Sequence, residues 1–167
     1  IYSPGNDTTS FTIPDSAEVY GGFNGHEDPE TFDLTDRNYT AHRTILTGYN
    51  ETTRNEKIVT MGDETILDGF VVKNGDLRGI SGEGVDFSIA NCVVEDNTEI
   101  GIYSENGDVS VSWCVIKDNG FDGIRHTGSN MVLTIENCKI HDNTRNGVYF
   151  DYSTGTVINS MIYHNGS

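Results

Sequence analysis

The sequence is poor in basic residues. Its 167 residues include only 10 Lys and Arg against 26 Asp and Glu, which gives a formal net charge of −16 at pH 7 and an isoelectric point near 4.4. A surface this acidic repels the phosphates of nucleic acids and of anionic lipid headgroups. The composition therefore predicts no nucleic-acid partner, and it fits a soluble extracellular protein or one that attracts divalent cations.

Long apolar runs and helical spacing are also missing. No stretch approaches the roughly 20 apolar residues of a membrane-spanning helix, so we expect no membrane insertion. Apolar residues do not recur at intervals of three and four anywhere over a useful length. Only three prolines occur, whereas 19 glycines, together with many Asn and Asp, supply turn-forming residues. These features predict short strands that are joined by tight turns.

A repeat fills the chain from residue 69 onward. Each unit has a small residue, an aliphatic residue two places later, and an asparagine three places after that. The five units are Gly69/Val71/Asn74, Cys92/Val94/Asn97, Cys114/Ile116/Asn119, Cys138/Ile140/Asn143 and Ser160/Ile162/Asn165. The steps between them are 23, 22, 24 and 22 residues. Such a period predicts a solenoid, in which equivalent residues stack on one another.

Three apolar segments make up each unit. In the third unit they are residues 109–111, 114–116 and 123–125, and Asn, Asp and Gly separate them. Short β-branched segments between turn formers indicate strands. The leucine–asparagine consensus of leucine-rich repeats is absent, and helical repeats need more than about 30 residues. The prediction is an all-β parallel β-helix with about 21–24 residues and three short strands per coil, the coils lying about 4.8 Å apart.

Alternation along the strands assigns the inward positions. One inward row consists of Cys92, Cys114 and Cys138, which lie beside Val94, Ile116 and Ile140. Ile102, Ile124 and Val148 form the inward row of another strand. Parallel side chains on adjacent strands are badly oriented for a disulfide, and zinc would need a fourth, tetrahedrally placed ligand. The cysteines are therefore expected to be buried thiols that fill the core.

Polar residues recur at two corners of the coil. At the first, Asn97, Asn119 and Asn143 follow Asp96, Asp118 and Asp142. At the second stand Asp68, Asn91, Asn137 and Asn159, with Trp113 as the exception. Asparagine tolerates left-handed backbone, and stacked amides form hydrogen-bonded ladders. We interpret these asparagines as structural.

The glycine–isoleucine and aspartate–asparagine elements of residues 65–167 resemble the right-handed parallel β-helix superfamily of pectate lyases. Residues 10–13, 19–25 and 44–48 look like the opening coils of secreted bacterial and archaeal surface β-helix proteins. Residues 44–48 (TILTG) also recur as residues 65–69 (TILDG), a step of 21 residues. The resemblance implies a right-handed coil and an extracellular or cell-surface location. We expect one domain over 1–167, with irregular opening coils in 1–64 and regular repeats in 65–167, within a longer protein or an assembly.

Three outward residues suggest a binding face. Tyr103, Arg125 and Tyr149 should stack on consecutive coils, where aromatic rings suit sugars and a guanidinium suits a sugar carboxylate. These side chains could equally do no more than cover the sheet. In β-helix polysaccharide lyases this face carries the cleft. The resemblance therefore implies calcium ligands among Asp96, Asp118, Asp122 and Asp142 and a base at Arg125 or His126.

No catalytic residue is assigned. The Asp-Asp pair, Gly-His-Gly and Arg-x-Lys elements of β-helix polygalacturonases do not occur in this sequence. The leading hypothesis is an extracellular, non-catalytic surface module, a structural or adhesive rod that contacts polysaccharide or stacks end to end with its own copies. The alternatives are a polysaccharide lyase or glycoside hydrolase and a carbohydrate-binding domain. Calcium is the one cofactor considered.

Four Asn-x-Ser/Thr triplets add candidate glycosylation sites. They begin at Asn6, Asn38, Asn50 and Asn165. In a secreted protein such triplets mark surface positions that can carry glycans.

Overall fold

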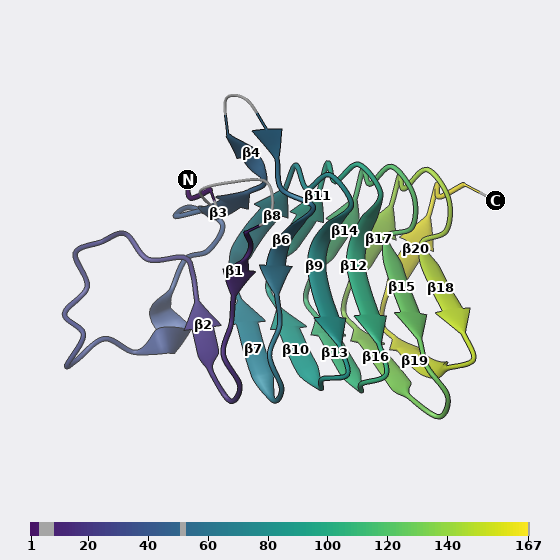
Figure 1. The fold of residues 1–167 in the computed structure, drawn as a ribbon. Helices are drawn as coiled ribbons and strands as arrows, with labels where there is room; N and C mark the ends of the chain where they lie inside the picture. Colours follow the sequence, from purple (N-terminus) through teal and green to yellow (C-terminus); the bar gives the residue numbers. More distant parts are fainter. Residues whose placement is uncertain (4–8, 51–52, 167) are drawn as a thin grey trace.

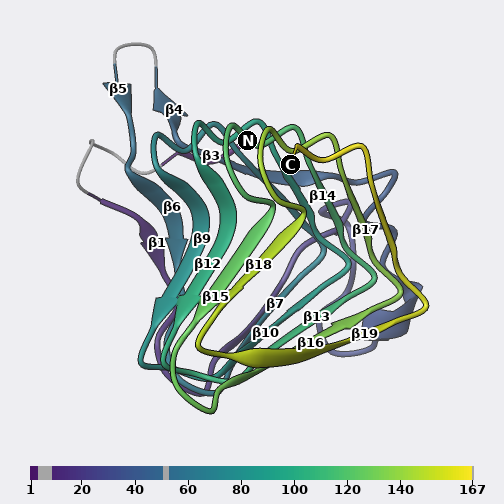
Figure 2. The same ribbon diagram turned by 90° about the vertical axis from the view of Figure 1, so that its right-hand side faces the viewer.

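The computed structural model describes residues 1–3, 9–50 and 53–166, and the side chains of residues 50 and 53 lie outside the description. The chain winds into a right-handed parallel β-solenoid with three strands per turn (Figure 1). Three sheets of six parallel strands enclose a roughly triangular cross-section (Figure 2), and β4 (Tyr49–Asn50) and β5 (Thr53–Arg54) form a separate antiparallel pair. The predicted all-β parallel β-helix is confirmed.

Each sheet collects one strand from every turn. Sheet 1 consists of β1 (Phe11–Thr12), β6 (Lys57–Thr60), β9 (Arg78–Glu83), β12 (Ile100–Glu105), β15 (Ile124–Thr127) and β18 (Val148–Asp151). Sheet 2 consists of β2 (Glu18–Tyr20), β7 (Thr65–Asp68), β10 (Phe87–Ala90), β13 (Val109–Ser112), β16 (Val132–Glu136) and β19 (Thr154–Ile158). Sheet 3 consists of β3 (Thr44–Thr47), β8 (Phe70–Lys73), β11 (Val93–Glu95), β14 (Val115–Lys117), β17 (Lys139–His141) and β20 (Met161–Tyr163).

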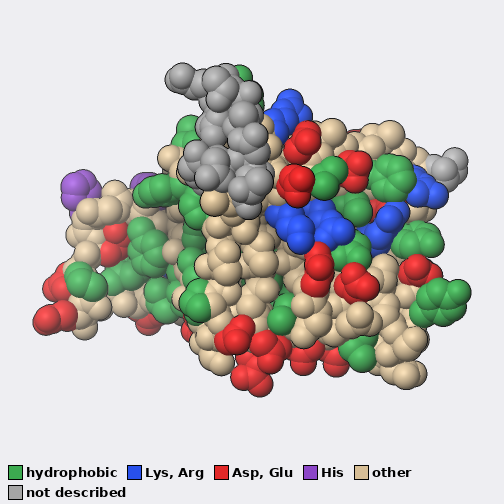
Figure 3. All heavy atoms as spheres, in the orientation of Figure 1, with side chains coloured by type: hydrophobic (Ala, Val, Ile, Leu, Met, Phe, Trp, Pro, Cys, Tyr) green, Lys and Arg blue, Asp and Glu red, His purple; other side chains and the backbone are tan. Residues whose placement is uncertain are grey.

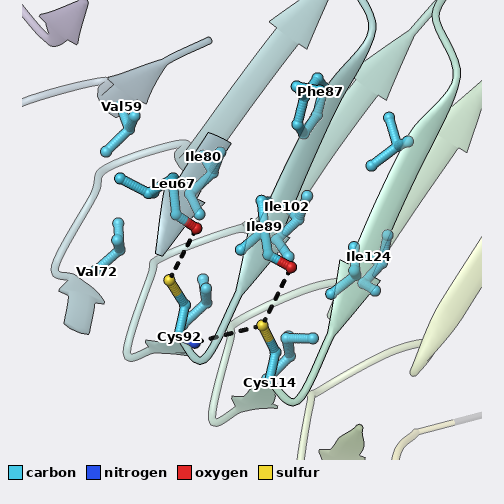
Figure 4. Packing of buried hydrophobic residues seen from close by; sticks show 14 of the residues in the cluster. Val59, Leu67, Val72, Ile80, Phe87, Ile89, Cys92, Ile102, Cys114 and Ile124 are labelled. Carbon is cyan, nitrogen blue, oxygen red and sulfur yellow. Dashed lines mark hydrogen bonds between the residues drawn. The ribbon is translucent and has the colours of Figure 1, made fainter. Parts of the chain in front are cut away.

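The core runs along the axis of the solenoid. Val94, Ile116 and Ile140 are in register and have no exposed surface, as alternation predicts. The inward cysteines line up beside them, and the backbone N–H of Cys92 donates to Cys114 Sγ at 3.4 Å (Figure 4). All three thiols are free and buried, which confirms the prediction. Burial raises the pKa of Cys114 well above its ordinary value, so this thiol stays protonated.

The first unit of the repeat differs from the prediction, because its inward residues lie one position further along the chain than the pattern indicates. Val71 pairs with Val93, so Phe70 holds the position of Cys92, and the Phe70 N–H donates to Cys92 Sγ at 3.5 Å. Gly69, with a φ of 82°, takes the left-handed corner that was assigned to Asp68. The error arose because Val71 and Val72 are both aliphatic. Local pattern could not tell which of the two points inward.

The repetition of residues 44–48 in residues 65–69 does not reflect stacking. β3 pairs with β8, and Thr44 lies beside Phe70, whereas β7 pairs with β2. The two similar segments therefore lie on different sheets. They look alike because each is a four-residue strand that ends at a glycine.

A long connection interrupts the opening turn. Residues 21–43 leave the solenoid between β2 and β3, and they project from its side in Figure 1. Their only helical segment is a 3-10 turn, Leu34–Asp36. Arg37 attaches this connection to the sheets, because its Nη2 lies 3.1 Å from Asp68 Oδ1 and its Nη1 donates to the Gly21 carbonyl. Among the described residues no helix is long and apolar enough to cross a membrane.

Candidate functional site

The asparagine corner is a continuous internal ladder. Asn97 Nδ2 donates to Asn119 Oδ1, and Asn119 Nδ2 donates to Asn143 Oδ1, each at 2.9 Å. All three side chains are buried, with 2% exposure or less. The ladder satisfies amide and backbone groups that would otherwise be buried without partners. These asparagines are therefore structural, as predicted.

The outward row on sheet 1 forms as predicted. Arg125 pairs with Tyr103 on one side and with Tyr149 on the other. The Arg125 guanidinium lies 5.0 Å from the centre of the Tyr149 ring, and that of Arg78 lies 3.5 Å from the centre of the Tyr103 ring. Cations and aromatic rings thus alternate along the sheet. In Figure 3 the Lys and Arg side chains gather over this face, with Asp and Glu around them.

A groove of about 570 Å³ follows this row. Its charged and aromatic lining residues are Tyr103, Glu105, Arg125, Arg145, Tyr149, Asp151 and Tyr152. Arg145 is exposed, and no carboxylate of the described residues lies within 4.0 Å of its guanidinium nitrogens. The Tyr103 hydroxyl donates to Glu105 at 2.7 Å, and burial together with this bond raises the pKa of Tyr103. The groove therefore combines an available cation with hydrogen-bond acceptors.

Arg125 is held in place by a buried carboxylate. Asp122 has no exposed surface, and its Oδ2 accepts from Arg125 Nε at 2.8 Å. Its Oδ1 accepts from Asn146 Nδ2 at 2.8 Å. A guanidinium paired in this way stays charged and cannot act as a base. Both oxygens of Asp122 are occupied by protein donors, so this residue does not present a metal ligand to the groove.

His126, the other candidate base, points into the core. It has no exposed surface, its Nδ1 lies 2.7 Å from Ser104 Oγ, and the edge of its ring faces Phe150. The base that the resemblance implies at this position does not reach the groove, because alternation places the neighbour of outward Arg125 on the inner side. Burial lowers the pKa of His126, and the Met131 backbone and Asp108 only partly oppose this shift.

We expect stability to fall on mild acidification because of His126. The unfolded chain takes up this proton near pH 6.5, whereas the folded chain takes it up only at lower pH. Between these two values the unfolded state binds more protons, so the free energy of unfolding decreases as pH drops below about 6.5. Urea unfolding between pH 7.5 and 5 measures this slope. The slope should be shallower in His126→Asn, and equal slopes in the two proteins would contradict the prediction.

The three aspartates proposed as calcium ligands stand at the corner before the ladder. Asp96, Asp118 and Asp142 share a left-handed backbone with φ of 54–55°. Asp118 lies 2.6 Å from Lys117 Nζ, and Asp142 lies 2.6 Å from His141 Nδ1. In residues 1–3, 9–50 and 53–166 no three acidic, His or Cys side chains gather closely enough to hold a metal ion. Calcium binding at this corner stays a prediction.

Sequence reasoning missed Tyr152. This residue lines the groove with 87% of its surface exposed, and its φ of 56° is left-handed. The same corner in the three preceding turns is occupied by Gly84, Asn106 and Gly128, all with positive φ. An aromatic residue at a position that otherwise takes Gly or Asn was a usable signal. The steps of 22, 22 and 24 residues between these corner positions match those of the repeat.

The glycosylation triplets have different surroundings. Asn38 is exposed on the 21–43 connection. Asn165 continues the asparagine ladder, and its Nδ2, the atom that would carry a glycan, donates to the Ile140 carbonyl at 3.0 Å. Asn6 and the side chain of Asn50 lie outside the described residues. Glycosylation stays a prediction at all four positions.

The fold and its ladders define a class, the right-handed parallel β-helices. The family described as "Right handed beta helix region" matches residues 46–167, which is most of the chain, so the protein belongs to this family. No curated protein matches the sequence, and no solved structure matches it. The family establishes the fold, whereas the function depends on the side chains that the faces of the solenoid present.

Proposed function

We propose that the protein is an extracellular, non-catalytic surface module, an adhesive rod that binds polysaccharide along the groove of sheet 1. The observation that carries this proposal is the in-register row of Tyr103, Arg125 and Tyr149, because it lines one open groove. A chain of sugar rings is itself a repeating, extended ligand. A row of side chains at the spacing of the strands therefore offers it repeated contacts.

The groove suits an acidic polysaccharide in particular. Arg145 has free guanidinium donors, which bind a carboxylate through two parallel hydrogen bonds. Glu105 and Asp151, on neighbouring parts of the groove, can accept hydrogen bonds from sugar hydroxyls. The tyrosine rings provide apolar faces between these charges. A non-catalytic role fits the pairing of Arg125 with Asp122 and the inward direction of His126.

Loss of the free cation should weaken binding. We expect Arg145→Ala to lower the affinity for uronic-acid oligosaccharides about tenfold or more, which corresponds to about 1.4 kcal/mol or more. Isothermal titration calorimetry at low salt measures this affinity. Lys139→Ala is the matched control, because Lys139 is an exposed cation on sheet 3, away from the groove. Equal losses in the two variants, or no saturable binding by the unmodified protein, would refute the proposal.

One arrangement favours a glycoside hydrolase as the second candidate. Glu105 and Asp151 flank Thr127 in register, so two strand spacings, about 9.6 Å, separate their backbones. Side chains on strands this far apart can bring their carboxylates to the roughly 6.5–9.5 Å separation found in inverting glycosidases. Release of new reducing ends from a polysaccharide, abolished in Asp151→Asn, would replace the non-catalytic proposal. Binding without any release supports the rod.

End-to-end stacking of copies is a further part of the proposal. In the turn of β19 and β20 the inward residues Val157 and Ile162 are each 44% exposed, so they offer an apolar surface to a further strand. Analytical ultracentrifugation over a range of protein concentrations measures self-association directly. Purely monomeric behaviour at the highest concentration would remove this part of the proposal.

A further inference from the structure

The single tryptophan of the chain occupies an unfavourable backbone position. Trp113 has a φ of 56°, in the left-handed region that costs a bulky residue conformational energy. At the same corner the neighbouring turns carry Gly69, Asn91, Asn137 and Asn159, all with positive φ. Backbone hydrogen bonding is the same throughout, since the Trp113 N–H donates to Glu136 as that of Asn91 does to Ser112.

Burial does not compensate for this conformation. Trp113 is 64% exposed, so most of its ring gains nothing from the core. Asparagine would adopt the corner more easily and is present in three of the other turns. A residue that is both strained and exposed, where its neighbours are neither bulky nor apolar, indicates a role other than stability.

The ring stands at the edge of a second groove. This groove, about 420 Å³ in volume, lies between sheet 3 and the 21–43 connection. Val71, Val93 and Val115 form its floor as an outward, in-register row on β8, β11 and β14. Trp113 and, from the connection, Tyr39 and Arg43 also line it. We call this the Trp113 groove.

The two cations next to the Trp113 groove, Arg43 and Lys117, are paired with carboxylates. Arg43 and Lys117 both contact the Glu95 carboxylate, at 3.6 and 3.2 Å. The 3.6 Å contact leaves Arg43 with unused N–H donors, and its side chain is 49% exposed. A purely apolar occupant would remove water from these donors without replacing its hydrogen bonds, which is costly. A hydroxylated, uncharged ligand replaces the hydrogen bonds that this water makes with the Arg43 donors.

We propose that the Trp113 groove is a second saccharide-binding site, specific for neutral sugars, on a different sheet from the groove of Arg145. The apolar face of a pyranose ring stacks on Trp113 and lies over the valine row, while its hydroxyls accept hydrogen bonds from Arg43. The site rests on observations separate from those for sheet 1. With both grooves occupied the rod is bivalent, which raises its avidity for a mixed polysaccharide surface.

The unique tryptophan makes this site directly observable. Neutral hexasaccharides of glucose (β-1,4 and β-1,3), xylose and mannose are titrated while Trp113 emission is recorded, alongside a uronic-acid hexasaccharide. We expect a saturable blue shift with at least one neutral sugar. No shift with any of them overturns the proposal. A shift that appears without sugar and grows with protein concentration also overturns it, because the occupant is then a second copy.

Substitution separates binding from stability. We expect Trp113→Asn to lower the calorimetric affinity for the neutral sugar about tenfold or more and to raise Tm by about 2–4 °C, because the backbone strain is relieved. Asn137→Gly, at the same corner in the next turn, should leave this affinity unchanged. Unchanged affinity in Trp113→Asn, or a lower Tm, overturns the proposal. Uronic-acid binding that is lost in Arg145→Ala reports on the sheet 1 groove independently.

Discussion

Replacement of Asn119 by alanine is expected to lower the free energy of unfolding by about 3–5 kcal/mol. Asn119 has no exposed surface, and its side chain takes part in four hydrogen bonds. Its Oδ1 accepts from the backbone N–H and the Nδ2 of Asn97, and its Nδ2 donates to Asn143 and Val94. Alanine leaves both Asn97 donors buried without a partner and opens a cavity in the corner.

The measurement is equilibrium denaturation in urea, with the last member of the ladder as control. Asn165 also accepts two hydrogen bonds, from the backbone N–H and Nδ2 of Asn143. It lies at the end of the ladder and is only partly buried, so water can replace it. Asn165→Ala should cost clearly less than Asn119→Ala. Equal costs would show that burial of the ladder does not determine its energy.

Gly101→Ala should have the second largest effect and lower the free energy of unfolding by about 3 kcal/mol. A Cβ at this position would lie 2.6 Å from the Gly123 carbonyl oxygen and 2.8 Å from Asn119 Nδ2. The backbone contact cannot be relieved by a side-chain rotation, and the amide contact displaces the ladder. The glycine of the glycine–isoleucine repeat is therefore required by the asparagine that packs over it.

A second glycine separates the steric effect of an added Cβ from the cost of a left-handed backbone. Gly84 has a φ of 72°, and no heavy atom lies within 4 Å of a Cβ built on it. Gly84→Ala should therefore lower the free energy of unfolding by only about 1–2 kcal/mol, the cost of placing an alanine in the left-handed region. In the double variant Gly101→Ala/Asn119→Ala the total cost should be less than the sum, since the displaced amide is already gone. Full additivity would mean that the two sites do not interact.

Part of the candidate site could be predicted from the sequence. The row of Tyr103, Arg125 and Tyr149 follows from the repeat step of 22 to 24 residues and from alternation along each strand. Neither rule says what each side chain contacts. The pairing of Arg125 with buried Asp122 depends on the shape of one turn, three residues away in sequence. The same alternation that places Arg125 outward places His126 inward.

The surroundings of Trp113 and the 21–43 connection could not be predicted from the repeat. Trp113 was visible as the exception in a corner of asparagines, but its groove needs the 21–43 connection, which is far from it in the sequence. The pairing of the opening strands is a second feature that the sequence pattern does not reveal. The long connection between β2 and β3 breaks the period, so residues 44–48 and 65–69 lie on different sheets although their sequences are similar.

The order of amino acids was sufficient for the coil, its three strands per turn, its inward rows and its asparagine ladder. These features depend on contacts between adjacent turns, which a short period encodes directly. The grooves, the partner of each charge and the pairing of the first strands were settled only in three dimensions. They depend on how an insertion of irregular length packs against the stack, and no repeated pattern encodes that packing.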